Sequence, residues 1–249
     1  MKHILGLFLS ALSLMANAEP LVVYDLSRDR SIPLEIGLPL NPTTCSVEKQ
    51  CNVAFISAGN RVPFQKYKFL SDALNEFGYM TIAVDHELPN DPPLSKTGDL
   101  YQTRIENWSR GAQTLDFLQE ELALRFTSYN FNSLTLVGHS NGGDISTWLS
   151  NENKSYISQL ITLDHKRVTL PKISKIRVLS LRSPEYPTKI GILPTIEEQQ
   201  LYDSCIVEIP ASKHMDFTDY GTNEMKQKTI HVVASFIKGT SCMSLKTKT

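Results

Sequence analysis

Short apolar runs alternate with longer amphipathic segments along this chain. Runs with the length and composition of β-strands cover residues 21–26, 32–38, 52–57, 79–84, 134–137, 157–163, 176–181 and 205–209. Helical spacing of apolar side chains predicts helices over residues 64–77, 100–125, 143–149, 194–202 and 223–237. The first two runs are separated by a short polar turn and are predicted to form a hairpin. The later alternation predicts an α/β fold, with a mostly parallel sheet of about eight strands and helices on both faces.

The most specific chemical pattern is Gly138-His139-Ser140-Asn141-Gly142, which has the form G-x-S-x-G. It follows the strand run 134–137 and precedes a helical pattern. That context is typical of a nucleophile elbow, where a sharp turn holds a serine hydroxyl at the end of a sheet. We therefore predict Ser140 as a nucleophile and the backbone N–H of Asn141 as an oxyanion donor. The alternative is an ordinary glycine-rich turn.

A nucleophilic serine needs a base, which is usually a histidine. His214 follows the last predicted strand, where the chain order serine, acid, histidine places the base. The alternative is a histidine on a surface loop. The other histidines outside the first 18 residues lie beside the serine, after earlier strands or inside the last helix: His86, His139, His165 and His231.

The acid that orients the histidine has two main candidates in the correct chain order. Glu185 follows the second strand after the serine, and this position favours it. Asp164 follows the first strand after the serine and remains the alternative. Asp216 and Asp219, which lie close to His214 in sequence, are less favoured.

A second oxyanion donor is expected in the turn Ala58-Gly59-Asn60, which follows the third predicted strand. We predict the backbone N–H of Asn60, with Gly59 as the less favoured donor. The sequence contains no H-E-x-x-H pattern, phosphate-binding glycine loop or dinucleotide fingerprint. No metal or organic cofactor is therefore expected.

These motifs, in this order, resemble the α/β-hydrolase superfamily, and most closely the branch of dienelactone hydrolases and platelet-activating-factor acetylhydrolase-like proteins. The segments that carry the resemblance are 58–60, 84–87, 138–143, 163–167, 182–185 and 213–216. Two departures stand out: Ala58 replaces a histidine found in many relatives, and Glu185 stands where aspartate is common. Because the segment 164–176 is short, no large lid is expected to be inserted there.

The resemblance implies an esterase with a Ser-His-acid triad, an acyl-enzyme intermediate and a small-molecule ester as substrate. Residues 19–249 would form one catalytic domain. A peptidase, thioesterase or acyltransferase on the same triad is the first alternative. A binding module on a degenerate hydrolase scaffold is the second alternative.

Residues 1–18 have the pattern of a signal peptide. Lys2 and His3 precede the apolar stretch 4–9, and Ala16-Asn17-Ala18 forms a cleavage site before Glu19. No later segment is long and apolar enough to span a bilayer, so no stable membrane insertion is expected after cleavage. We predict an exported protein, periplasmic or secreted.

Four cysteines fit an oxidising compartment and allow three pairings. We favour Cys45–Cys51 and Cys205–Cys242 over the other pairings and over a metal site. The formal net charge is −1 and no cluster of lysines and arginines occurs, so nucleic-acid binding is not expected. The sequence does not indicate an oligomeric state.

Overall fold

A computed structural model of the chain describes residues 19–246. The predicted signal peptide therefore lies outside the described residues. The strands are β1 (Glu19–Asp25), β2 (Arg30–Gly37), β3 (Cys51–Ser57), β4 (Met80–Val84), β5 (Tyr129–His139), β6 (Ile157–Leu163), β7 (Arg177–Arg182) and β8 (Ser204–Glu208). The helices are α1 (Lys68–Glu76), α2 (Ile105–Arg125), α3 (Asn141–Asn151), α4 (Ile196–Leu201), α5 (Asn223–Ile237) and α6 (Cys242–Lys246). Short 3₁₀ turns cover Pro42–Thr44, Gln102–Arg104 and His214–Phe217.

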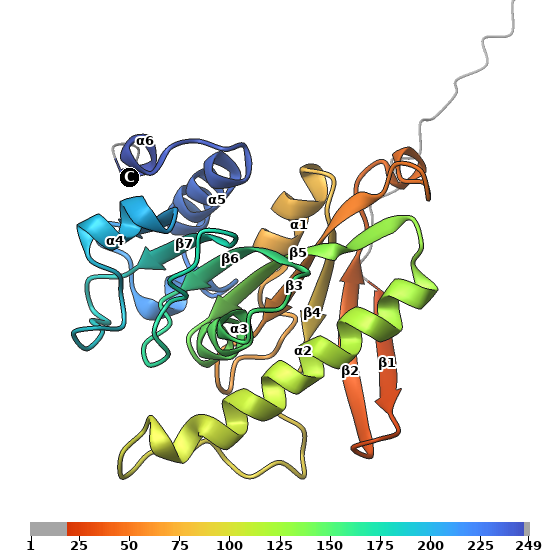
Figure 1. The fold of residues 1–249 in the computed structure, drawn as a ribbon, viewed down its shortest axis with the longest axis horizontal. Coiled ribbons are helices and arrows are strands. Elements are labelled where there is room, and N and C mark those ends of the chain that lie inside the picture. The colour runs from red at the N-terminus through yellow and green to blue at the C-terminus, as the bar shows by residue number, and fades with distance from the viewer. Residues whose placement is uncertain (1–18, 247–249) are drawn as a thin grey trace, which may run out of the picture.

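All eight strands form one sheet in the order β1-β2-β4-β3-β5-β6-β7-β8 (Figure 1). The pairs β1–β2 and β2–β4 are antiparallel, and every later pair is parallel. Parallel strands bring their carboxyl ends to one edge, so the loops that follow β3, β5, β6, β7 and β8 meet there. The predicted mostly parallel sheet is confirmed.

Helices cover both faces of the sheet because successive side chains of a strand point to opposite sides. In β3, Phe55 packs into the core cluster that contains α2 and α3, whereas Ile56 packs into the cluster that contains α1 and α5. Figure 1 shows α2 crossing in front of the strands. This double burial explains why the central strands are apolar without alternation.

Most helices and strands lie where the sequence pattern predicts them, but the boundaries of some helices differ. The predicted helix 64–77 begins only at Lys68, because the Asp219 carboxylate accepts hydrogen bonds from the N–H groups of Lys68 and Phe69. The predicted helix 100–125 begins as a 3₁₀ turn, and α2 itself starts at Ile105. The final predicted helix, 223–237, coincides with α5.

The two predicted disulfides are both present. Cys45–Cys51 precedes and enters β3, and Cys205–Cys242 joins β8 to α6. The five-residue helix α6 was not predicted from the sequence; it is held by its disulfide and by the buried side chain of Leu245. Isolated helices of this length are unstable in water, so tertiary contacts hold it in place.

Residues 164–176 contain no helix or strand, in agreement with the absence of a large lid. Among residues 19–246, no helix combines the length and apolar character needed to cross a membrane.

Candidate active site

Ser140 occupies the turn between β5 and α3, with φ 52° and ψ −118°. These backbone angles lie outside the regions that serine normally adopts. The turn is held by two hydrogen bonds: the Ser140 N–H donates to Leu163 O at 2.9 Å, and the Asp144 N–H donates to Ser140 O at 3.0 Å. This is the strained strand–turn–helix geometry of a nucleophile elbow.

Both glycines of the motif are required by close backbone packing. A Cβ atom at Gly142 would lie 2.2 Å from Ser57 O, and one at Gly138 would lie 2.3 Å from Gly142 O. Side chains at these positions would push α3 away from β3 and from β5. The glycines therefore allow the contact that fixes the position of Ser140.

His214 links the serine to a carboxylate. Its Nε2 lies 3.0 Å from Ser140 Oγ, and its Nδ1 lies 3.1 Å from Asp164 Oδ2. The three residues come from the loops after β8, β5 and β6. The imidazole is 18 % exposed, whereas the Asp164 side chain is fully buried. The His214 ring is thus reachable from solvent, whereas the Asp164 carboxylate is shielded.

Asp164 is held by donors on several sides. Its Oδ1 accepts the Ser183 N–H at 2.7 Å, and its Oδ2 accepts a short hydrogen bond from Ser183 Oγ. The Arg182 guanidinium lies 3.7 Å from Oδ1. These contacts orient Asp164 toward Nδ1 of His214 and compensate for the burial of its charge.

Glu185, the acid favoured by the sequence analysis, does not contact the imidazole. Its Oε1 accepts a hydrogen bond from the backbone N–H of His214 at 2.6 Å. Both carboxylates thus contact the same histidine, but only Asp164 contacts its ring nitrogen. The preference for Glu185 rested on its place after β7, and chain order cannot distinguish a ring contact from a backbone contact.

The two remaining acid candidates serve other parts of the fold. Asp216 Oδ2 accepts the Lys213 N–H at 2.8 Å, within the 3₁₀ turn that carries His214. Asp219 caps α1, as described above. Neither forms a hydrogen bond to the His214 ring in the described part of the chain.

The oxyanion candidates lie in the turn after β3 and at the start of α3. Asn141 is the first residue of α3, where backbone N–H groups have no partner inside the helix. Its side chain is fixed, because Oδ1 accepts Trp108 Nε1–H at 3.0 Å and Nδ2 donates to Asn107 Oδ1 at 2.8 Å. In the turn after β3, the Gly59 N–H donates to Tyr67 Oη at 2.8 Å. That bond occupies Gly59 and leaves Asn60 as the favoured donor of this turn.

Three other histidines are buried, and burial lowers the pKa of each to about 3: His86, His139 and His165. His86 Nε2 lies 3.0 Å from Ser57 Oγ, and none of the three contacts Ser140 Oγ in the described residues. His231 lies on the exposed side of α5. Among the histidines of residues 19–246, His214 is the one whose ring nitrogen forms a hydrogen bond with Ser140 Oγ.

A stack of side chains on His214 was not predicted from the sequence. The Tyr186 ring stacks on the His214 ring at 3.9 Å, and Lys166 Nζ lies 3.9 Å from the centre of the Tyr186 ring. The His139 ring also lies 4.6 Å from that of His214. Only the position of Tyr186 next to Glu185 gave any signal for this contact.

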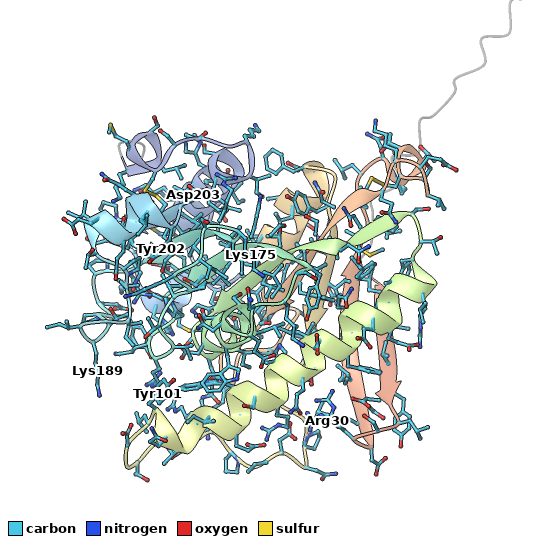
Figure 2. All side chains as sticks on the ribbon, viewed as in Figure 1. Arg30, Tyr101, Lys175, Lys189, Tyr202 and Asp203 are labelled. Atoms are coloured by element: carbon cyan, nitrogen blue, oxygen red, sulfur yellow. A yellow bond between two sulfur atoms is a disulfide. The ribbon has the colours of Figure 1, made fainter. Side chains whose placement is uncertain are left out.

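Several cavities open at the carboxyl edge of the sheet. One of about 260 Å³ adjoins Gly59, His86 and Asn141. Another of about 460 Å³ is lined by Tyr101, Lys189 and others, and Figure 2 shows these two side chains at the end of the molecule where α2 begins. Within residues 19–246, no group of three or more His, Cys, Asp or Glu side chains is arranged to hold a metal ion.

Neither protein-family models nor curated protein sequences give a match to this chain. Solved structures do match in fold. The dienelactone hydrolase from Anabaena variabilis is 10% identical with a TM-score of 0.57, over 90% of this chain and 98% of that one. A highly thermostable carboxyl esterase from Bacillus coagulans is 11% identical with a TM-score of 0.62, over 90% and 99%.

Esterase 2 from Thermogutta terrifontis, solved phosphorylated by paraoxon, is 13% identical with a TM-score of 0.62, over 94% of this chain and 98% of that one. The similarity thus extends over nearly the whole length of each neighbour. Together with the sheet order and the elbow, it confirms the predicted fold: the chain has the α/β-hydrolase fold, which it shares with dienelactone hydrolase-like proteins and esterases.

Proposed function

We propose that the protein is a serine hydrolase that cleaves carboxylic esters, with Ser140, His214 and Asp164 as its triad. The observation that carries the proposal is the alignment of Ser140 Oγ, the two ring nitrogens of His214 and Asp164 Oδ2, with contacts of 3.0 and 3.1 Å. This is the arrangement in which an imidazole takes the hydroxyl proton while a buried carboxylate stabilises the imidazolium. The esterases among the structural neighbours support the same reaction class.

The reaction has two halves. In the first, His214 Nε2 takes the proton of Ser140 Oγ as the oxygen attacks the ester carbonyl, and the N–H groups of Asn141 and Asn60 stabilise the oxyanion. The carbon–oxygen bond to the alcohol then breaks, and His214 returns the proton to the leaving alkoxide. In the second half, His214 deprotonates a water molecule, which attacks the acyl-enzyme. Collapse of this second intermediate releases the acid and restores Ser140.

The proposed substrate is a small-molecule ester that enters from the carboxyl edge of the sheet. The segment 164–176 adds no helix over this edge, and the cavity beside Gly59 and Asn141 opens next to the elbow. We therefore expect an accessible site that accepts short acyl groups.

A kinetic comparison tests the proposal. Wild-type protein with intact disulfides is assayed on p-nitrophenyl esters of increasing acyl length, beside Ser140→Ala. The expected result is saturable hydrolysis by the wild type and a loss of at least about 10³-fold in kcat for Ser140→Ala. Equal rates for the two folded proteins on every ester would contradict the proposal.

We also propose that the protein is exported and that residues 19–249 form its mature, single catalytic domain. The signal pattern of residues 1–18 and the two disulfides support this, because disulfides persist in oxidising compartments. Terminal sequencing of protein from the extracytoplasmic fraction should give Glu19 as the first residue. Full-length protein found only in the cytoplasm would contradict export.

A further inference from the structure

Two buried polar side chains outside the triad contact each other next to the elbow. Tyr67 precedes α1 and His139 is the last residue of β5, and each is 1 % exposed. Tyr67 Oη lies 2.9 Å from His139 Nδ1. The reaction proposed above uses neither group, although His139 directly precedes Ser140 in the chain.

The hydrogen bonds around this pair fix the position of every proton. His139 Nε2 lies 3.0 Å from the carbonyl oxygen of His214, which only accepts, so Nε2 carries the ring proton. A neutral imidazole has one N–H, and Nδ1 must then accept. The Tyr67 hydroxyl therefore donates to Nδ1 while it accepts the Gly59 N–H at 2.8 Å.

His139 is neutral under ordinary conditions, since burial lowers its pKa to about 3. A protonated ring would carry a second N–H on Nδ1, directed at Tyr67 Oη. The tyrosine proton would then lose its acceptor in a buried place. The neutral tautomer with the proton on Nε2 is the form that satisfies all four groups.

The chain of hydrogen bonds joins three separate parts of the site. It starts at Gly59, next to the oxyanion candidate Asn60, passes through Tyr67 and His139, and ends at the backbone of His214. The His139 ring also packs against the His214 ring at 4.6 Å. One buried network thus spans the oxyanion turn, the elbow and the loop of the base.

Both backbone polar groups of His214 are held by side chains. The N–H donates to Glu185 Oε1 at 2.6 Å, and the carbonyl accepts from His139 Nε2. His214 lies in a loop whose regular structure is one short 3₁₀ turn, His214–Phe217. These two bonds therefore help to fix the backbone of His214, while Asp164 and the Tyr186 ring contact its imidazole.

We propose that Tyr67 and His139 are positioning residues that hold the oxyanion turn and the base in register with Ser140. The inference rests on the proposed function, since it assigns these side chains to the same reaction. Neither residue contacts the reacting atoms. Their effect passes through Gly59 and the backbone of His214.

Tyr67→Phe is the direct test, because it removes one hydroxyl and keeps the ring. It leaves the Gly59 N–H and His139 Nδ1 without partners while the triad remains intact. We expect kcat for a p-nitrophenyl ester to fall about 10- to 100-fold, as for small misplacements of catalytic groups, with KM changed less than about threefold. Labelling of Ser140 by a fluorophosphonate should slow in parallel but still reach completion.

Tyr79→Phe is the matched control. Tyr79 is also buried, at 4 % exposure, but it directly precedes β4. It therefore lies at the amino ends of the parallel strands, away from the carboxyl edge that holds Ser140. The same loss of a buried hydroxyl there should leave kcat and the labelling rate unchanged. An equal fall of kcat in both variants would overturn the positioning role, because it would reflect general destabilisation.

A second pair of variants applies if Tyr67→Phe does not fold. In His139→Gln the amide offers a donor and an acceptor, whereas His139→Leu offers neither. We expect the glutamine variant to retain at least about tenfold more kcat than the leucine variant. The amide can keep one neutral hydrogen bond to Tyr67 and one to the His214 carbonyl, which leucine cannot. Equal kcat in the two variants would overturn the proposal.

The outcomes separate this inference from the function on which it rests. An active wild type with an equally active Tyr67→Phe variant would contradict the positioning role and leave the proposed serine hydrolase function standing. A folded wild type that neither hydrolyses esters nor reacts with the fluorophosphonate would contradict the proposed function, and the positioning role with it.

Discussion

Asp164 Oδ2 lies 3.1 Å from His214 Nδ1, on the side of the imidazole opposite to the nitrogen that faces Ser140. Asp164 is fully buried, and its φ of 52° turns the chain sharply after β6. Glu185 approaches the same histidine from the backbone side. Asp164 therefore contacts the imidazole ring of His214, and Glu185 contacts its backbone.

This division predicts different effects for two isosteric substitutions. Asp164→Asn should lower kcat about 10³- to 10⁴-fold, because the neutral amide no longer stabilises the imidazolium or selects the correct tautomer. Glu185→Gln should lower kcat by less than about tenfold, since the amide oxygen still accepts the His214 N–H. Steady-state kinetics on one ester, with circular dichroism to confirm folding, measures both. A larger loss for Glu185→Gln than for Asp164→Asn would return the role of acid to Glu185.

The packing around Gly142 predicts a severe effect of one methyl group. In Gly142→Ala the new Cβ would meet Ser57 O at 2.2 Å and Ala58 O at 2.4 Å, and both are backbone atoms that cannot rotate away. We expect the free energy of unfolding to fall by more than about 4 kcal/mol, or folding to fail.

Gly191→Ala is the control for that substitution. Gly191 has φ +88° and open space around the position of a Cβ, so the change should cost only about 1–2 kcal/mol of backbone strain. Urea unfolding of both variants gives the comparison. Similar stability of the two alanine variants would show that the close approach at Gly142 does not constrain the elbow.

The Cys205–Cys242 disulfide should contribute more stability than Cys45–Cys51. The first closes a separation of 37 residues and the second a separation of 6. In the chain-entropy description their loss costs about 4 and about 2 kcal/mol. Denaturant unfolding of the double serine variants at each pair measures the difference. A greater loss from removing Cys45–Cys51 would contradict this ranking.

The buried histidines predict that stability decreases in mild acid. His86, His139 and His165 have pKa values lowered to about 3 by burial, against 6.5 in the unfolded chain. Between these values the unfolded state binds protons that the folded state does not. The free energy of unfolding should therefore fall as pH decreases from about 6.5 toward 3, by up to about 1.4 kcal/mol per pH unit for each histidine. Urea unfolding at pH 7, 6 and 5 measures the slope.

A single variant isolates this contribution from that of the carboxylates. The pKa of Asp144 is raised by burial, so its effect on stability has the opposite sign in acid. In His86→Asn only one histidine is removed, and the slope between pH 6 and 5 should decrease by about one proton equivalent, about 1.4 kcal/mol per pH unit. An unchanged slope would show that His86 is protonated in the folded state.

The sequence predicted best where structure and chemistry lie close together in the chain. The elbow occupies five consecutive residues, and the strand before it and the helix after it carry clear periodicity, so Ser140 and its context were evident. The sheet could be predicted as mostly parallel, but the order of its strands could not be predicted. The start of α1 could not be located, because its cap, Asp219, is about 150 residues away.

The long-range contacts of the site had no local signal. Asp164 and Glu185 both follow strands, and only the three-dimensional path of each loop shows which one reaches the His214 ring. The partnership of Tyr67 with His139 spans 72 residues and depends on the hydrogen-bond geometry of a buried hydroxyl. Periodicity and motif spacing do not contain that information.

In the proposed mechanism, His214 and Asp164 activate Ser140 as a nucleophile. The most direct measurement is the reaction of the folded, oxidised protein with a fluorophosphonate, followed by intact mass and peptide mapping. We predict one phosphonyl group per chain, located on Ser140, and no adduct in Ser140→Ala. A folded wild type that forms no adduct, or one modified equally in Ser140→Ala, would contradict the proposed mechanism and favour a binding role for the scaffold.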